Sequence, residues 1–158
     1  MQIAPFKLER YFAEYEFKVR YQLSPSDCES LSLRELLQMA DAQGLALWNN
    51  LGLGYTESPG HPLLRAEVAQ MYETMTPDDV LIAAPEEAIF IAMHTLLQPG
   101  DHVVTLFPAY QSLYEIAHAM GCAVTRWSFE LDASDWRLDL DRLASLLTKH
   151  TRLLVLNF

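Results

Sequence analysis

The spacing of apolar and polar residues changes character near residue 80 of this chain. From there on, short apolar runs alternate with longer segments in which apolar residues recur at helical spacing. The runs predict strands at 80–84, 102–107, 122–129 and 152–157, and the segments predict helices at 86–97, 110–120 and 140–147. Strands that alternate with helices in this way predict an α/β fold built from βαβ units around a mostly parallel sheet.

The sequence before residue 80 predicts an N-terminal arm followed by helices. Residues 1–30 are rich in aromatic side chains. We expect this arm to pack against a protein surface, either of its own chain or of a second subunit. Ser32 and Glu35 have the spacing of a capping box, and Gly44 fits the residue that ends the helix begun there. Pro62 fits the first turn of a further helix, where its missing N–H costs nothing.

Composition and charge narrow the class of protein. Hydrophobic residues make up 51% and charged residues 20%, as in globular proteins. A net charge of −10 argues against binding to nucleic acid, and the longest apolar runs, such as 88–93, are too short to cross a membrane. The N-terminus lacks the pattern of a secretory signal. Cys28 and Cys122 form no metal-binding motif, so no metal site is predicted, and two thiols suit a reducing cytoplasm.

Two junctions between strands and helices carry candidate binding residues. Tyr110 follows the predicted strand 102–107, where its ring fits either a stacking partner for a flat cofactor or an ordinary aromatic packing residue. Pro85 and Glu86 begin a helix whose free N–H groups would suit an anion, although Pro85 is also a common first helical residue and acidic side chains repel phosphate. His94 and His118 are more typical of packing residues than of ligands.

Several segments, in order, resemble one family. Tyr55 to Arg65 resembles the Y-x-x-S-x-G-x-x-x-L-R stretch of class I/II, fold-type-I aminotransferases, which depend on pyridoxal 5′-phosphate (PLP). Residues 87–110 resemble the family's series EAI, L-x-P-G-D-x-V and P-x-Y, and residues 154–158 resemble the strand that leads into its Asn-Pro-x-Gly loop. The resemblance therefore implies that residues 31–158 are the N-terminal part of a PLP-binding large domain, preceded by the arm 1–30.

The resemblance implies roles for four residues. Tyr110 would stack on the pyridine ring of PLP, the amides at Pro85 and Glu86 would hold its phosphate, and Tyr55 would reach the phosphate of a neighbouring subunit in a homodimer. The chain departs from the family at 84–86, where small residues, usually including glycine, are expected. Pro85 has no N–H to donate, so one phosphate hydrogen bond must be lost or replaced.

The resemblance also implies that the catalytic machinery is incomplete in these 158 residues. The family's Schiff-base lysine, its pyridinium aspartate and its substrate arginine all come from sequence beyond Phe158, so no catalytic residue is predicted here. We expect a fragment of an aminotransferase that moves an amino group from an amino acid to a 2-oxo acid. A lyase, cyclase or oxidase of the same fold, and a non-catalytic α/β interaction module, are the alternatives.

Overall fold

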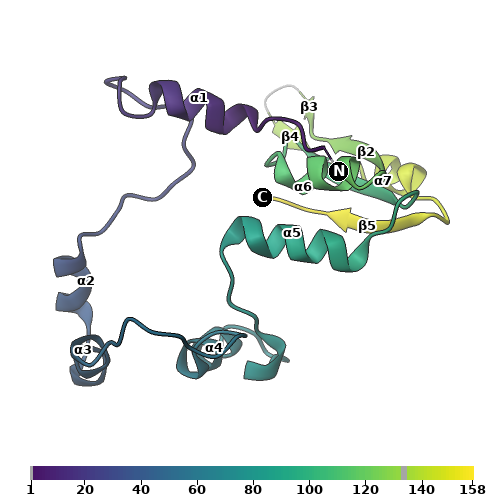
Figure 1. Ribbon diagram of the computed structural model, residues 1–158. Helices are drawn as coiled ribbons and strands as arrows, with labels where there is room; N and C mark the ends of the chain where they lie inside the picture. The colour runs from purple at the N-terminus through teal and green to yellow at the C-terminus, as the bar shows by residue number, and fades with distance from the viewer. Residues whose placement is uncertain (1, 133–134) are drawn as a thin grey trace. The chain divides into compact units, whose positions relative to one another are not determined.

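The computed structural model describes residues 2–132 and 135–158, which divide into two compact units (Figure 1). The first unit combines residues 1–18 with Ala83–Phe158, and the second comprises Val19–Ile82. Each unit is described by itself.

A parallel three-stranded sheet forms the centre of the first unit. Strand β1 (His102–Phe107) lies between β2 (Ala123–Ser128) and β5 (Thr151–Val155), and both neighbours run parallel to it. The predicted α/β fold with a mostly parallel sheet is confirmed, and three of the four predicted strands form within two residues of the expected bounds. The carboxyl ends of β1 and β2 pair at Phe107 and Ser128, and Tyr110 follows β1 at this edge of the sheet.

Helices cover both faces of this sheet. Helices α5 (Pro85–Leu96) and α6 (Ser112–Ala119) pack against one face, where Met93, Val103 and Ile116 belong to one buried cluster. Helix α7 (Leu140–Leu146) packs on the other face, where Leu143 borders a cluster that contains Val104, Leu106 and Trp127. Successive side chains of a strand point to opposite faces, so the continuous apolar run of β1 is buried on both sides.

Glycines end two of these elements as the sequence predicts. Gly100 and Gly121 have φ values of +92° and +86°, a region that L-residues with a side chain rarely adopt. A short antiparallel hairpin of β3 (Glu130–Asp132) and β4 (Asp135–Arg137) follows β2, and the sequence pattern did not predict it. Its strands are three residues each, too short to show an alternation of apolar and polar positions.

The N-terminal residues are part of the first unit. Helix α1 spans Lys7–Tyr15, and the residues before it run beside α6 (Figure 1). The Gln111 side chain bonds to the backbone at Pro5 and Lys7. The beginning of the aromatic arm therefore packs against its own chain.

The second unit contains three helices, α2 (Leu33–Met39), α3 (Ala42–Asn49) and α4 (Pro62–Ala69), and the 3-10 turn η1 (Pro77–Asp79). The Ser32–Glu35 capping box at α2 and the proline at the start of α4 are confirmed. The prediction that Gly44 ends the first helix is wrong. Ala40 is extended (ψ 140°), and the Asp41 carboxylate then accepts a 2.7 Å hydrogen bond from the Gly44 N–H, which starts a new helix.

The predicted strand 80–84 does not form. Among the described residues it pairs with no other strand, although Val80 and Ala84 have extended backbones. Its polar groups bond elsewhere: the Ile82 N–H donates to Pro59 at 2.9 Å, and the Val80 carbonyl accepts from the Arg65 side chain. An apolar extended run becomes a strand only where a neighbouring strand supplies the hydrogen bonds.

Candidate cofactor site

Tyr110 lies in the loop between the carboxyl end of β1 and the start of α6. This loop begins with a cis peptide bond between Phe107 and Pro108. The Tyr110 side chain remains 36% exposed, so part of its ring is open to a ligand. In parallel α/β sheets this edge, at the carboxyl ends of the strands, is where ligands bind.

The N-terminal segment packs directly on this loop. The ring of Phe6 meets the ring of Tyr110 edge to face, with centroids 4.7 Å apart and an interplanar angle of 64°. The Tyr110 hydroxyl donates a long hydrogen bond of 3.4 Å to Glu9. The adjacent Gln111 side chain bonds to the backbone of the same segment, which fixes that segment against the start of α6.

The N-terminus of α5 supplies free backbone donors in the same unit. The first helical bond recorded there runs from the Ala88 N–H to Ala84, so within the described chain the N–H groups of Glu86 and Glu87 have no backbone partner. Pro85 occupies the first helical position and donates nothing. The Glu86 carboxylate accepts a 3.2 Å hydrogen bond from the Ser112 hydroxyl, which links the starts of α5 and α6.

Acidic groups and burial act together on Tyr110. Partial burial raises the pKa of its phenol above the ordinary value of 10.0, and the negative charges of Glu86 and Glu9 raise it further. Tyr110 is therefore a neutral hydrogen-bond donor at physiological pH. The structure thus brings Glu86 and Tyr110 together from two different helix starts.

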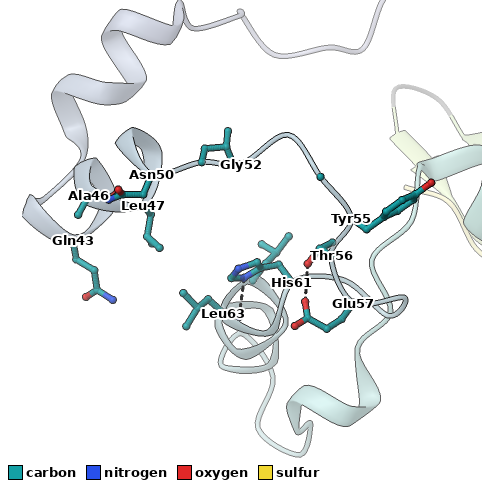
Figure 2. A pocket seen from close by; sticks show the side chains of 13 residues that line it. Gln43, Ala46, Leu47, Asn50, Gly52, Tyr55, Thr56, Glu57, His61 and Leu63 are labelled. Carbon is teal, nitrogen blue, oxygen red and sulfur yellow. Dashed lines mark hydrogen bonds between the residues drawn. The ribbon is translucent and has the colours of Figure 1, made fainter.

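Tyr55 belongs to the second unit and is fully exposed (Figure 2). It lines an open groove of about 1180 Å³ together with residues of α3, of the following loop and of α4. Two local hydrogen bonds lie among the lining residues: Thr56 donates to Glu57 at 2.7 Å, and the Leu63 N–H donates to the His61 ring at 3.3 Å. The phenol of Tyr55 is free in this unit to contact another molecule.

Comparison with known proteins identifies the family. The sequence pattern of the family described as aminotransferase class I and II matches residues 25–157. The chain belongs to this family. It is 32% identical over 154 residues to capreomycidine synthase of Streptomyces vinaceus. The aligned residues make up 96% of this chain and 39% of that protein. It is 27% identical over 110 residues to aspartate aminotransferase of Sulfurisphaera tokodaii, covering 66% of this chain and 28% of that protein.

Solved structures of the aminotransferase family have the same fold. A PLP-dependent aminotransferase from Streptococcus suis matches 98% of this chain and 42% of its own, with a TM-score of 0.84 and 27% identity. The PLP-dependent cyclase OrfR matches 100% of this chain and 41% of its own, with a TM-score of 0.83 and 27% identity. The chain thus spans about 40% of the length of such relatives, as the resemblance implied.

The residues of the first unit fit the cofactor of this family in part. An exposed aromatic ring and free N–H groups at a helix start are what a flat, phosphorylated ring would contact. Pro85 lacks a donor, and the exposed carboxylates of Glu86 and Glu87 lie at the same helix start. The N–H groups of Glu86 and Glu87 are therefore the donors that the start of α5 leaves without a backbone partner.

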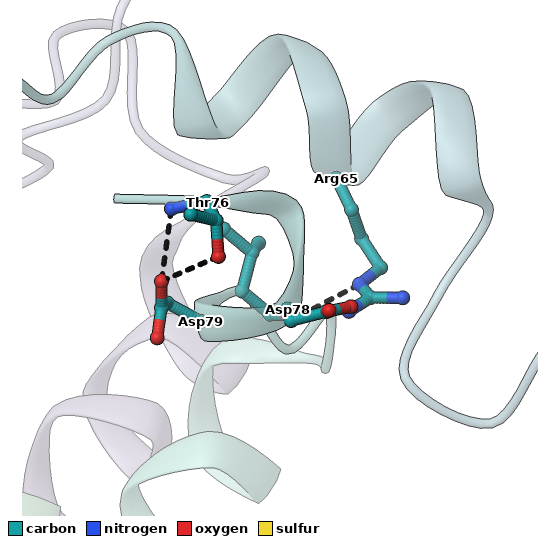
Figure 3. Close-up of polar contacts among 5 residues, drawn as sticks. Arg65, Thr76, Asp78 and Asp79 are labelled. Carbon is teal, nitrogen blue, oxygen red and sulfur yellow. Dashed lines mark hydrogen bonds and ion pairs between the residues drawn. The ribbon is translucent and has the colours of Figure 1, made fainter. Parts of the chain in front are cut away.

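Sequence reasoning missed the residues that support this site. Gln111 and Phe6 carry no motif, and only the tertiary structure places them at Tyr110. Arg65 lies within the recognised motif, yet its role was not predicted. Its guanidinium donates to the Val80 carbonyl at 2.9 Å and pairs with Asp78 at 3.2 Å, which ties α4 to the η1 turn (Figure 3).

In the part of the chain that the structure describes, no group of three or more His, Cys, Asp or Glu side chains is arranged to hold a metal ion. None of the described helices combines the length and the apolar character that a membrane crossing requires.

Proposed function

We propose that this chain is part of a PLP-dependent enzyme that transfers the amino group of an amino acid to a 2-oxo acid. The observation that carries the proposal is the position of Tyr110: it follows the central strand at its carboxyl end, half-exposed, in one unit with the free N–H groups of α5. Family membership supplies the cofactor class.

The proposal gives specific roles to four residues of the first unit: Tyr110, Glu86, Glu87 and Ser112. The Tyr110 ring stacks on the cofactor ring, and the N–H groups of Glu86 and Glu87 bind the phosphate at the positive end of α5. The Ser112–Glu86 hydrogen bond keeps the Glu86 carboxylate on the α6 side of the helix start. PLP, when bound, supplies an electron sink for the carbanion that forms at the substrate's α-carbon.

Tyr55 is assigned to a second subunit's site in the proposed enzyme. Its exposed phenol has no hydrogen-bond partner among the described residues and is free to donate to a phosphate. A homodimer in which each copy lends Tyr55 to the other would use it in this way. Substrates are expected to be amino acids and 2-oxo acids.

A second candidate, a cyclase or synthase that uses the same cofactor, is favoured by two relatives. Capreomycidine synthase matches nearly the whole chain, and the cyclase OrfR matches all of it with a high TM-score. Both kinds of relative are PLP-dependent, so the cofactor-binding residues of the first unit would serve either reaction. A non-catalytic α/β module is the third alternative.

Three measurements on the protein as its gene encodes it separate these functions. PLP binding is measured by equilibrium dialysis, and amino acids are then supplied with and without a 2-oxo acid. Transfer of isotopic nitrogen to the 2-oxo acid identifies an aminotransferase, whereas a cyclised product formed without the 2-oxo acid identifies a cyclase. Failure to bind PLP at any concentration below 1 mM, about the weakest affinity expected of a specific site, would refute both enzymes and favour the module.

A further inference from the structure

A single side chain anchors the N-terminal segment to the candidate site. The Oε1 atom of Gln111 accepts from the Lys7 N–H at 2.9 Å, and its Nε2 atom donates to the Pro5 carbonyl at 3.0 Å. Gln111 is only 8% exposed, so the side chain that makes both bonds lies within the protein. Because one planar amide makes both bonds, it fixes the position and the direction of the backbone on either side of Phe6.

The anchored segment reaches Tyr110 at two points. The Phe6 ring, between the two anchored backbone groups, packs edge to face against the Tyr110 ring at 4.7 Å. Glu9, three residues further on in α1, accepts from the Tyr110 hydroxyl at 3.4 Å. One contact restricts rotation of the ring, and the other restricts the direction of the hydroxyl.

Tyr110 needs such support because of where it lies. It belongs to neither β1 nor α6, so no regular hydrogen-bond ladder holds its backbone. A stacking residue contributes most when its rotamer is fixed before the ligand arrives. The Phe6 contact leaves 36% of Tyr110 exposed, so support and stacking are compatible.

We propose that residues 5–9 act in the same chain as a positioning element of the cofactor site, with Phe6 orienting the Tyr110 ring and Gln111 anchoring Phe6. This inference rests on the proposed role of Tyr110 in stacking on PLP. Phe6 and Gln111 touch Tyr110 or its neighbours rather than the cofactor, so they are positioning residues. The N-terminal arm thereby contributes to the cofactor site of its own chain.

A double-mutant cycle on the protein as its gene encodes it tests this role. Phe6→Ala should weaken PLP binding about three- to tenfold, the range that corresponds to the loss of one aromatic pair. In a Tyr110→Ala background the same change should have no further effect, because Phe6 acts through that ring. Phe17→Ala is the matched control: Phe17 follows α1 in the same N-terminal arm, its ring is 92% exposed, and its loss should not change binding.

A readout without PLP separates this inference from the proposed function. The Tyr110 phenol is titrated spectrophotometrically and assigned by difference from Tyr110→Phe. Burial raises the pKa of this phenol, beside Glu86 of α5 and Glu9 of α1, so Phe6→Ala should lower the titration midpoint and Phe17→Ala should not. Gln111→Met, which keeps the length of the side chain, adds no charge and loses both hydrogen bonds, should act as Phe6→Ala does.

The outcomes are distinct. If the parent protein binds no PLP but Phe6→Ala still lowers the Tyr110 titration midpoint, the proposed function is refuted. The support of Tyr110 by Phe6 then still stands. An unshifted midpoint in both Phe6→Ala and Gln111→Met would overturn the inference whether or not PLP binds. Equal weakening of PLP binding by Phe6→Ala with and without the Tyr110 ring would also overturn it.

Discussion

The Nδ1 atom of His102 lies 2.8 Å from the hydroxyl oxygen of Thr151 on the neighbouring strand β5. The other ring nitrogen, Nε2, lies 2.8 Å from the Thr125 hydroxyl on β2, on the opposite side of β1. One imidazole therefore joins all three strands of the sheet. A neutral imidazole has one donor and one acceptor, and a hydroxyl can be either, so the three side chains satisfy one another.

Replacing His102 should weaken the first unit. His102→Leu leaves the Thr125 hydroxyl without this partner inside the sheet, which should lower the free energy of unfolding by ~1–3 kcal/mol. Denaturant unfolding followed by the fluorescence of Trp127, which is 3% exposed, measures the effect. His150→Leu, at an exposed histidine just before β5, is the control and should be nearly neutral. Thr125→Val and the double variant His102→Leu/Thr125→Val test the coupling. If the two single losses in the free energy of unfolding add up to the loss in the double variant, the predicted coupling is contradicted.

Gly60 should tolerate no side chain. Its φ is +110°, and an added Cβ would lie 2.5 Å from the Cγ1 atom of Ile82. Gly60→Ala should destabilise the second unit by ~1–2 kcal/mol from backbone strain, in addition to the clash. Hydrogen exchange of the Ile82 N–H, which bonds to Pro59, should accelerate. Gly54→Ala, where a Cβ meets nothing within 4 Å, should leave that exchange rate unchanged, and equal rates in both variants would count against the prediction.

Tyr110 and Tyr114 should differ in their effect on PLP. Tyr114 lies within α6, where its ring packs 5.9 Å from Phe107 and 5.6 Å from the Arg126 guanidinium. Tyr110 lies at the sheet edge and has free ring surface. Tyr110→Ala should therefore raise the dissociation constant of PLP by roughly tenfold more than Tyr114→Ala, as expected for ~1–2 kcal/mol of stacking. Equal affinities of the two variants would argue against stacking on Tyr110.

The capping box of α2 should make that helix sensitive to acid. The Ser32 hydroxyl, and then the Ser32 N–H, lower the pKa of the Glu35 carboxyl. Because the folded pKa is lowered, the stabilisation is present above the ordinary glutamate value of ~4.3 and is lost as the pH falls through the lowered pKa.

An NMR titration of Glu35 tests this prediction. Ser32→Ala should move the Glu35 midpoint up toward the ordinary value, because the larger of the two hydrogen bonds is lost. Ser30→Ala, a similar change outside the box, should not. A midpoint in the parent protein at or above the ordinary glutamate value would show that the box does not form.

The two units should differ in their protection from hydrogen exchange. Val103, Val104 and Leu106 of β1 are completely buried, whereas the buried hydrophobic residues described in the second unit are Ala69 and Val80. Local stability follows buried apolar contacts. The amides of β1 should exchange far more slowly than those of α3, and equal protection of the two would contradict this expectation.

The sequence alone determined the three strands of the parallel sheet and the helices α5, α6 and α7 that cover it. Strand β1, the helix α5 and the turns at Gly100 and Gly121 follow from local patterns: an apolar run, a helical repeat and a residue suited to positive φ. For these elements the local signals agree with the tertiary structure, so the pattern alone was enough to find them. The motifs from Tyr55 to Phe158 were enough to indicate the family.

Only the tertiary structure decided which distant residues meet. The extended run 80–84 looks like a strand in sequence, but a strand depends on a partner that the sequence pattern does not reveal. The arm reaches Tyr110 through Gln111, 104 residues from Lys7, and no periodicity encodes such a contact. Local spacing fixes helices and strands because their hydrogen bonds are short-range. The surroundings of Tyr110 depend on side chains brought together by burial, which acts without regard to distance along the chain.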